Sequence, residues 1–181
     1  MGLSLTDARW LVECEKRLIV RDSVWATRPP RTSKSGETHT FECRVGTAGA
    51  LPRGLWFRVV LFPRYPDTAT IQLECDRPDS RSHMTLYRVE WRPLSGHMNA
   101  LDGRPEEFAG MRFEPGDTHE HSCLDHAFGP SDLIEPPGVH LARPISPDFQ
   151  DFAQVLAHAC GKLRITNGDA VPPPKDQGSF I

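Results

Sequence analysis

The sequence predicts an α+β fold: an antiparallel meander of four or five strands flanked by an N-terminal and a C-terminal helix. Apolar residues recur at two-residue spacing through the middle of the chain and at helical spacing near both ends. The segments between the predicted strands are too short for the crossover helices of a parallel sheet. Residues 1–170 are therefore expected to form a single α+β domain, and residues 171–181 a proline-rich C-terminal extension.

The first helix is expected over residues 5–20. Thr6 is a suitable N-cap, and Leu5 and Trp10 are spaced to form a hydrophobic staple. Residues 28–36 then read as an exposed polar loop, because they contain two prolines and no apolar period. Its cations form the only local patch through which nucleic acid could bind, namely Arg28, Arg31 and Lys34.

Four strands are expected between residues 38 and 91, where the apolar period is two. In the third run, for example, Ile71, Leu73 and Cys75 share one face. Such alternation is typical of an antiparallel sheet with one face on a core. Pro, Gly, Asp or Ser residues bound the four runs, which are residues 38–45, 55–62, 69–75 and 84–91.

Residues 94–117 show no sustained period and are expected to form a long irregular connection. The second helix is expected to begin at Ser146 as N-cap, with Pro147 at its first position and Asp148 in its first turn. The apolar stripe predicted to pack on the sheet is Phe149, Phe152, Ala153, Leu156, Cys160 and Leu163.

The composition excludes several classes of protein. A net charge of -3 and a pI near 6.2 give no overall basic field for nucleic acid or anionic lipid. Residues 1–7 show no basic n-region, so no leader is expected, and no apolar run approaches the roughly 20 residues of a membrane span. The five cysteines are odd in number and widely spaced, which favours free thiols over a disulfide framework. We therefore expect a cytoplasmic protein that does not associate with membranes.

Residues 118–126 place three imidazoles, one thiol and two carboxylates within nine positions. If this stretch is extended, His119, His121 and Cys123 project from one face, as metal ligands from one strand do. The sequence thus predicts either no cofactor or a single zinc ion on these three residues. A complete site needs a further ligand, for which the candidates are His83, His97, Asp125 and His126.

The same side chains also suit metal-free hydrolysis of a phosphodiester, in which one imidazole accepts a proton and another donates one. The catalytic candidates are then His119 and His121 with Cys123 or His126. Arg88, Arg112 or Arg143 could hold the phosphate. A third interpretation makes residues 118–124 an ordinary polar strand whose imidazoles bond to loop backbone.

The order of several motifs resembles that of ubiquitin-conjugating enzymes. A Phe-Pro/Tyr-Pro turn at residues 62–66 is followed by His97-Met98-Asn99 and by a Cys-Leu segment at Cys123. The resemblance implies that Cys123 is a thioester nucleophile and that Asn99 stabilises the oxyanion. Met98 replaces the family's proline, and the gap from Asn99 to Cys123 is longer than in the family.

The last third of the chain resembles small uncharacterised bacterial proteins that often lie in mobile or defence-associated loci. The shared features are a His-x-His element, a Cys-containing C-terminal helix and a proline-rich end. Because no complete catalytic signature is present, the leading expectation is a non-enzymatic, protein-binding accessory module of such a system. The alternatives are a metal- or histidine-dependent hydrolase or nuclease of toxin type and a conjugating-enzyme relative that uses Cys123.

Overall fold

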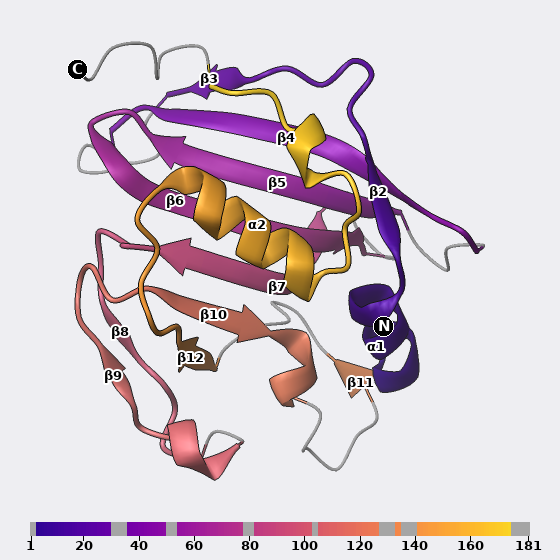
Figure 1. Ribbon diagram of the computed structural model, residues 1–181. Coiled ribbons are helices and arrows are strands. Elements are labelled where there is room, and N and C mark those ends of the chain that lie inside the picture. The colour runs from indigo at the N-terminus through magenta and orange to yellow at the C-terminus, as the bar shows by residue number, and fades with distance from the viewer. Residues whose placement is uncertain are drawn as a thin grey trace.

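The computed structural model describes residues 3–29, 36–49, 54–77, 82–102, 105–126, 133–134 and 141–174. Its main feature is an eight-stranded antiparallel sheet with a helix, α2, lying across one face (Figure 1). The strand order is β12-β10-β7-β6-β5-β4-β2, and β3 also pairs with β4. The strands are β2 (Lys16–Ile19), β3 (Ala26–Arg28), β4 (Thr38–Thr47), β5 (Leu55–Phe62), β6 (Tyr65–Asp76), β7 (His83–Trp91), β10 (His119–Ser122) and β12 (Ala142–Pro144).

The predicted α+β class and antiparallel sheet are confirmed. The four predicted runs correspond to β4, β5, β6 and β7, which form the centre of the sheet. The sheet has more strands than the four or five expected. The additional strands, β2, β3, β10 and β12, have three or four residues each, too few to show a period of two.

Helix α1 (Leu5–Glu13) is shorter than the predicted helix over residues 5–20. Its N-cap is Ser4 and not Thr6, because the Ser4 hydroxyl accepts a hydrogen bond from the Asp7 backbone N–H at 3.0 Å. Residues 16–19 form β2 instead, which pairs with β4. The prediction failed there because pairing with β4 outweighs the helical spacing of the apolar residues.

Helix α2 (Phe152–Lys162) begins later than predicted. Asp151 is its N-cap, and its side chain accepts a hydrogen bond from the Gln154 N–H at 2.8 Å. The expected start at Ser146 is wrong. Asp148 instead accepts hydrogen bonds from the Thr118 hydroxyl at 2.6 Å and from Arg92 Nε at 2.8 Å. These contacts tie the segment before α2 to the sheet edge.

A buried lysine joins the ends of the two helices. The Lys16 ammonium is fully buried and donates to the carbonyl oxygens of Val12, Cys14 and Leu163 at 2.6–2.9 Å. Two of these carbonyls, Val12 and Leu163, lie at the C-terminal ends of α1 and α2, where backbone acceptors lack helical partners. Burial lowers the pKa of Lys16 to about 8. Lys16 therefore satisfies carbonyls that the fold would otherwise bury unpaired.

Shorter elements lie beside the edge formed by β10 and β12 (Figure 1). Within residues 94–117, predicted to be irregular, β8 (His97–Met98) pairs with β9 (Arg112–Phe113). Asn99 anchors this hairpin, because its amide donates to the Phe108 and Ala142 carbonyls and accepts from the Ala142 N–H, each at 2.8 Å. The remaining elements are β1 (Leu3–Ser4), β11 (Leu133–Ile134), η1 (Glu106–Phe108), η2 (Cys123–His126) and η3 (Gly168–Ala170).

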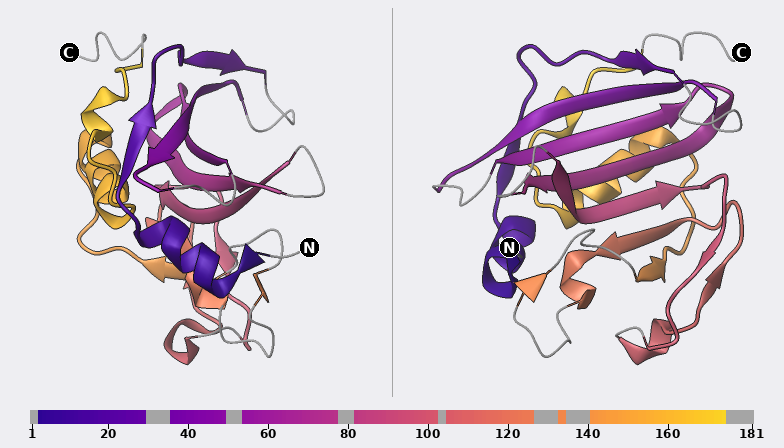
Figure 2. Two further views of the ribbon diagram at one scale, coloured as in Figure 1. Left: turned by 90° about the vertical axis from the view of Figure 1, so that its right-hand side faces the viewer. Right: turned by 180° about the vertical axis from the view of Figure 1, so that it is seen from behind.

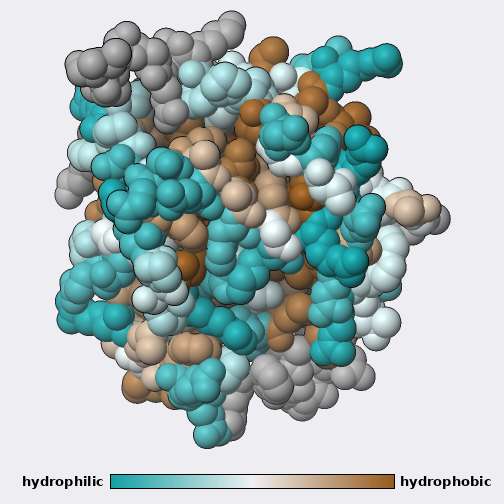
Figure 3. Space-filling view, in the orientation of Figure 1, coloured by the Kyte–Doolittle hydropathy of each residue, from teal (hydrophilic) through white to brown (hydrophobic). Residues whose placement is uncertain are grey.

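The two faces of the sheet differ. The α2 face carries the hydrophobic core, to which α2 contributes Val155, Ala159 and Cys160. Seen from outside, this side of the molecule mixes hydrophilic and hydrophobic side chains (Figure 3). On the opposite face, no described helix covers β4, β5, β6 or β7, as the rear view in Figure 2 shows. Among the described residues, no helix is long and apolar enough to cross a membrane.

Candidate metal centre

The two histidines of β10 project from the open face of the sheet. The residue between them, Glu120, faces α2, where it accepts hydrogen bonds from His158 Nε2 at 3.0 Å and Lys162 Nζ at 2.9 Å. Because side chains alternate along a strand, His119 and His121 point the opposite way. The prediction that these two imidazoles share a face is confirmed. Both are buried, at 0% and 2% exposure.

The neighbouring strand β7 places two charged side chains beside them. Cα pairing sets His119 opposite Glu90 and His121 opposite Arg88. His119 Nε2 lies 2.9 Å from Glu90 Oε2, and Arg88 Nη2 donates to His121 Nε2 at 3.2 Å. Arg88 Nε lies 3.2 Å from Glu90 Oε1. The two strands thus bring two imidazoles, a guanidinium and a carboxylate together.

The third imidazole comes from the β8–β9 hairpin. The His97 ring stacks on Phe113 at 5.1 Å between centroids and on His121 at 5.4 Å, and meets His119 edge-on at 4.8 Å. One nitrogen of each of the three histidines lies within 4.8 Å of the other two. We call His97, His119 and His121 the histidine cluster. It could hold a metal ion.

Two nitrogen atoms of the cluster are buried without a hydrogen-bond partner among the described residues: His97 Nε2 and His121 Nδ1. Nearly all buried polar side-chain atoms in folded proteins have a partner, so these two atoms mark a place where a metal ion or a water molecule could bind. His119 differs, because its Nδ1 donates to the Asp117 carbonyl at 2.7 Å and its Nε2 faces Glu90.

Electrostatics keep two of the imidazoles neutral. Burial and the Arg88 charge lower the pKa of His121 to about 3. Burial and the neighbouring His119 also lower the pKa of His97. The neutral imidazole is the form that binds metals, because a protonated ring has no free lone pair. Two of the three imidazoles, those of His97 and His121, therefore favour the neutral form that a metal requires.

Glu90 supplies a negative charge at the edge of the cluster. Burial alone would raise the pKa of its carboxyl group, but the hydrogen bond with His119 and the Arg88 charge outweigh burial and lower the pKa to about 2. Glu90 is thus a carboxylate at neutral pH. Its side chain is 21% exposed, whereas that of its partner His119 is fully buried, so solvent reaches the carboxylate side of the pair.

Cys123 lies outside the histidine cluster. Strand β10 ends at Ser122, and Cys123 begins η2, so the alternation that would place its thiol beside the imidazoles stops one residue earlier. The thiol is fully buried, and burial raises its pKa to about 12. This environment is typical of an inert structural cysteine.

The other candidate residues are bound elsewhere or lie outside the described part. Asp125 pairs with Arg143, and His83 Nδ1 lies 3.2 Å from Glu74 Oε2. Asn99 uses its whole amide to anchor the hairpin. The His126 side chain lies outside the described residues, as do Arg31, Lys34 and residues 175–181, while Arg28 is exposed in β3.

Sequence reasoning named His97 only as one of several possible further ligands and Arg88 only as a possible phosphate partner. It missed Glu90 entirely. A signal for the last two existed: Arg88 and Glu90 have the same two-residue spacing as His119 and His121. If the strands at residues 84–91 and 118–122 had been predicted to pair, this spacing would have placed all four side chains on one face.

Comparison with known proteins found no matching family model, no matching curated protein and no matching solved structure. Function is therefore inferred from the site itself. Fold and site together define an α+β protein with a candidate three-histidine metal centre on the open face of its sheet.

Proposed function

We propose that this protein is a zinc-dependent hydrolase whose metal is held by His97, His119 and His121. The observation that carries the proposal is the convergence of three imidazoles, two of which have a buried nitrogen without a partner among the described residues. Imidazole nitrogen is a preferred ligand of zinc, and the described donors at the cluster include no thiolate.

The number of ligands favours a catalytic site over a structural one. Structural zinc sites are closed by four protein ligands, whereas catalytic sites use three and keep a position open. Three histidines converge among the described residues. The cluster also touches the open face of the sheet through Arg88 and Glu90, which are 29% and 21% exposed. A small substrate would approach the site from that side, where solvent reaches these two side chains.

A carbonyl group orients one of the proposed ligands. His119 Nδ1 donates to the Asp117 carbonyl, which leaves Nε2 as the nitrogen directed toward Glu90. Metal-binding histidines commonly donate their second N–H to a carbonyl or carboxylate in this way, which fixes the ring. A metal at Nε2 would displace to solvent the proton that this nitrogen now shares with Glu90. The carboxylate is then free to face the metal or its water.

Zinc at this position would supply Lewis acidity and activate water at neutral pH. The chain's own groups would do the rest. Glu90 stays ionised and can accept a hydrogen bond from the attacking water, which orients it. The buried rings of His119 and His121, with Phe113 packed at 4.7 Å from His119, exclude bulk water from the inner side.

The other two functions remain predictions. A protein-binding accessory role of the kind predicted for bacterial defence or mobile-element systems does not require the histidine cluster. A thioester on Cys123 requires the thiol to become accessible, since it is fully buried here.

Metal content and hydrolysis measured together test the proposal. Purified protein should contain one zinc per chain, and the His119→Ala/His121→Ala variant none. His83→Ala is the matched control, because His83 lies outside the cluster on the same sheet. The zinc-loaded protein should hydrolyse p-nitrophenyl acetate or bis(p-nitrophenyl) phosphate, and the double variant should not. Zinc bound without hydrolysis of either ester would favour a structural site, and hydrolysis after complete metal removal would favour the metal-free mechanism.

A further inference from the structure

We propose that metal binding releases Arg88 from His121, and that Arg88 then holds an oxyanion of the substrate, a phosphate ester or a carboxylate, beside the metal. This inference rests on the proposed metal site and adds the substrate class and the order of binding. Its starting observation is the hydrogen bond from Arg88 Nη2 to His121 Nε2 at 3.2 Å.

That hydrogen bond cannot survive metal binding. A guanidinium only donates, so His121 Nε2 must accept with its lone pair, and the ring proton resides on Nδ1. A metal at Nε2 takes this lone pair directly. A metal at Nδ1 instead forces the ring proton onto Nε2, so that Nε2 becomes a donor facing the donor Arg88 Nη2. Arg88 loses its acceptor in either case.

Apart from its contact with His121, the Arg88 guanidinium has an ion pair with Glu90 among the described contacts. Its Nε is buried without a hydrogen-bond partner, although Glu90 Oε1 lies 3.2 Å away, because the pair is not aligned as a hydrogen bond. The other oxygen of Glu90 faces His119 Nε2. A released Arg88 therefore has donors to offer to a new acceptor.

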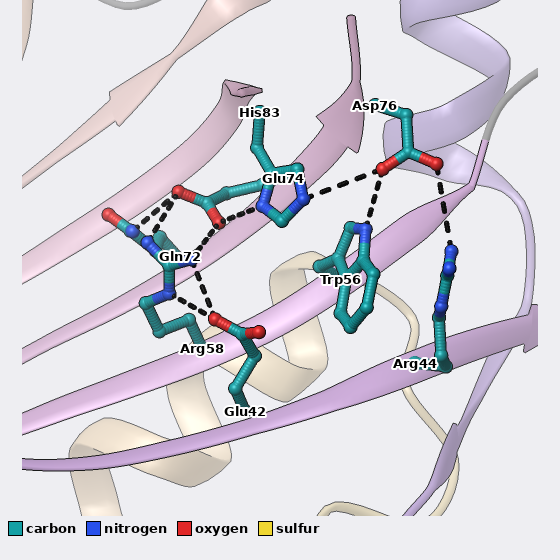
Figure 4. Close-up of polar contacts among 8 residues, drawn as sticks. All are labelled: Glu42, Arg44, Trp56, Arg58, Gln72, Glu74, Asp76 and His83. Atoms are coloured by element: carbon teal, nitrogen blue, oxygen red, sulfur yellow. Dashed lines mark hydrogen bonds and ion pairs between the residues drawn. The ribbon is translucent and has the colours of Figure 1, made fainter. Parts of the chain in front are cut away.

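Arg58 shows what a fully paired arginine on this face looks like. It lies between two carboxylates, with Nη2 at 2.6 Å from Glu42 Oε2 and at 3.2 Å from Glu74 Oε2 (Figure 4). Its Nε also donates to Glu42 at 2.8 Å. Arg58 and Arg88 are thus chemically identical and similarly exposed, at 25% and 29%, but differ in pairing. Arg58 is a matched control for Arg88.

The position of Arg88 suits contact with a substrate. Cα pairing places one row of polar side chains across successive strands of the open face: Glu42, Arg58, Gln72, Arg88 and His121. The last two residues of this row are Arg88, whose guanidinium is half-buried, and His121, whose imidazole is buried. Arg88 is therefore the group that a ligand on the open face meets immediately before the cluster.

Charge selects an anion as that ligand. A divalent metal and Arg88 together carry three positive charges, against one negative charge on Glu90. An oxyanion with two free oxygens restores balance, since one oxygen can face the metal while the other accepts from the planar guanidinium. Phosphate esters and carboxylates both meet this requirement.

The test uses the full chain loaded with one equivalent of cobalt(II), whose visible absorption reports changes at the metal. Phenyl phosphate and benzoate are titrated separately, with affinities from calorimetry. At least one should bind the wild-type protein and shift the cobalt spectrum, and its binding should weaken about tenfold to a hundredfold in Arg88→Met. Arg58→Met should bind within about twofold of wild type. Whichever probe binds more tightly identifies the oxyanion.

Three results would overturn the inference. The first is a cobalt-loaded protein that binds neither probe, and the second is Arg88→Met binding the probe as tightly as wild type. The third is equally tight binding without cobalt, because Arg88 is then not released by the metal. If the wild-type protein does not bind cobalt, both the proposed metal site and this inference are overturned. If it binds cobalt but gives any of the three results, this inference alone is overturned.

Discussion

Replacing Arg88 with methionine should make the protein bind zinc more tightly, which is unusual for a substitution at a metal site. Methionine keeps an unbranched side chain but removes the charge and every donor. In the wild-type protein, zinc must displace the hydrogen bond between Arg88 Nη2 and His121 Nε2. It must also approach a guanidinium that carries the same sign of charge. Arg88→Met removes both obstacles.

The size of the effect follows from elementary electrostatics. Charges of +2 and +1 separated by about 6 Å in a medium with a dielectric constant of about 80 repel by about 1.4 kcal/mol. The displaced hydrogen bond has a neutral acceptor and a charged donor, and such bonds contribute about 1.5–3 kcal/mol. Arg88 can move toward solvent, so the two terms do not add fully. We expect zinc affinity to rise about tenfold to a hundredfold.

Competition with a chromophoric zinc chelator measures this affinity at fixed pH and ionic strength. Arg58→Met controls for the loss of one positive charge on the same face, and its zinc affinity should stay within about twofold of wild type. Unchanged or weaker zinc binding in Arg88→Met would refute the competition between Arg88 and the metal. Equal gains in both variants would show that the effect is one of overall charge.

Three further predictions concern the structure around the site. Lys16→Met should lower the free energy of unfolding at pH 7 by about 2–4 kcal/mol, because two buried carbonyls and one half-buried carbonyl lose their donor. The pKa of Lys16 is about 8 in the folded protein and 10.5 ordinarily, so the unfolded chain binds more protons between pH 8 and pH 10.5. In urea titrations, the free energy of unfolding of wild type should therefore rise by up to about 3 kcal/mol relative to Lys16→Met across that interval. A difference between the two proteins that does not change with pH would contradict the buried ammonium. Asn99→Ala should lower the free energy of unfolding by about 2–4 kcal/mol and weaken zinc binding, because the β8–β9 hairpin loses its hydrogen bonds to Ala142. Met98→Ala, which changes an exposed neighbouring residue, should alter neither the free energy of unfolding nor zinc binding. Thiol labelling of the folded protein should modify Cys14 first, since the other four cysteines are buried; equally fast labelling of Cys123 would revive the thioester hypothesis.

The central sheet could be predicted from the sequence, whereas its edges could not. Strands β5 and β7 match the predicted runs within one residue, because their alternating burial requires a period of two over eight or nine residues. The start of α2 was misplaced because Ser146, the predicted cap, and Asp151, the observed one, are equally good N-caps in isolation. Only the contacts of Asp148 with Thr118 and Arg92, from distant parts of the chain, select Asp151.

Part of the candidate metal site could also be predicted from the sequence, and part could not. The shared face of His119 and His121 follows from strand geometry and needs no tertiary information. The convergence of His97 depends on a hairpin of two-residue strands held by Asn99, which no local pattern indicates. Cys123 was a reasonable ligand candidate until the strand was seen to end at Ser122. Where a short strand ends is decided by packing, not by the sequence pattern.

X-ray absorption at the zinc edge of the loaded protein tests the central claim most directly. The account predicts a first shell of nitrogen and oxygen at about 2.0–2.1 Å, with the multiple-scattering pattern of imidazole rings. His97→Ala should reduce that imidazole signal by about one ring, and His83→Ala should leave it unchanged. A sulfur scatterer at about 2.3 Å would instead place a cysteine such as Cys123 on the metal and contradict the three-histidine centre.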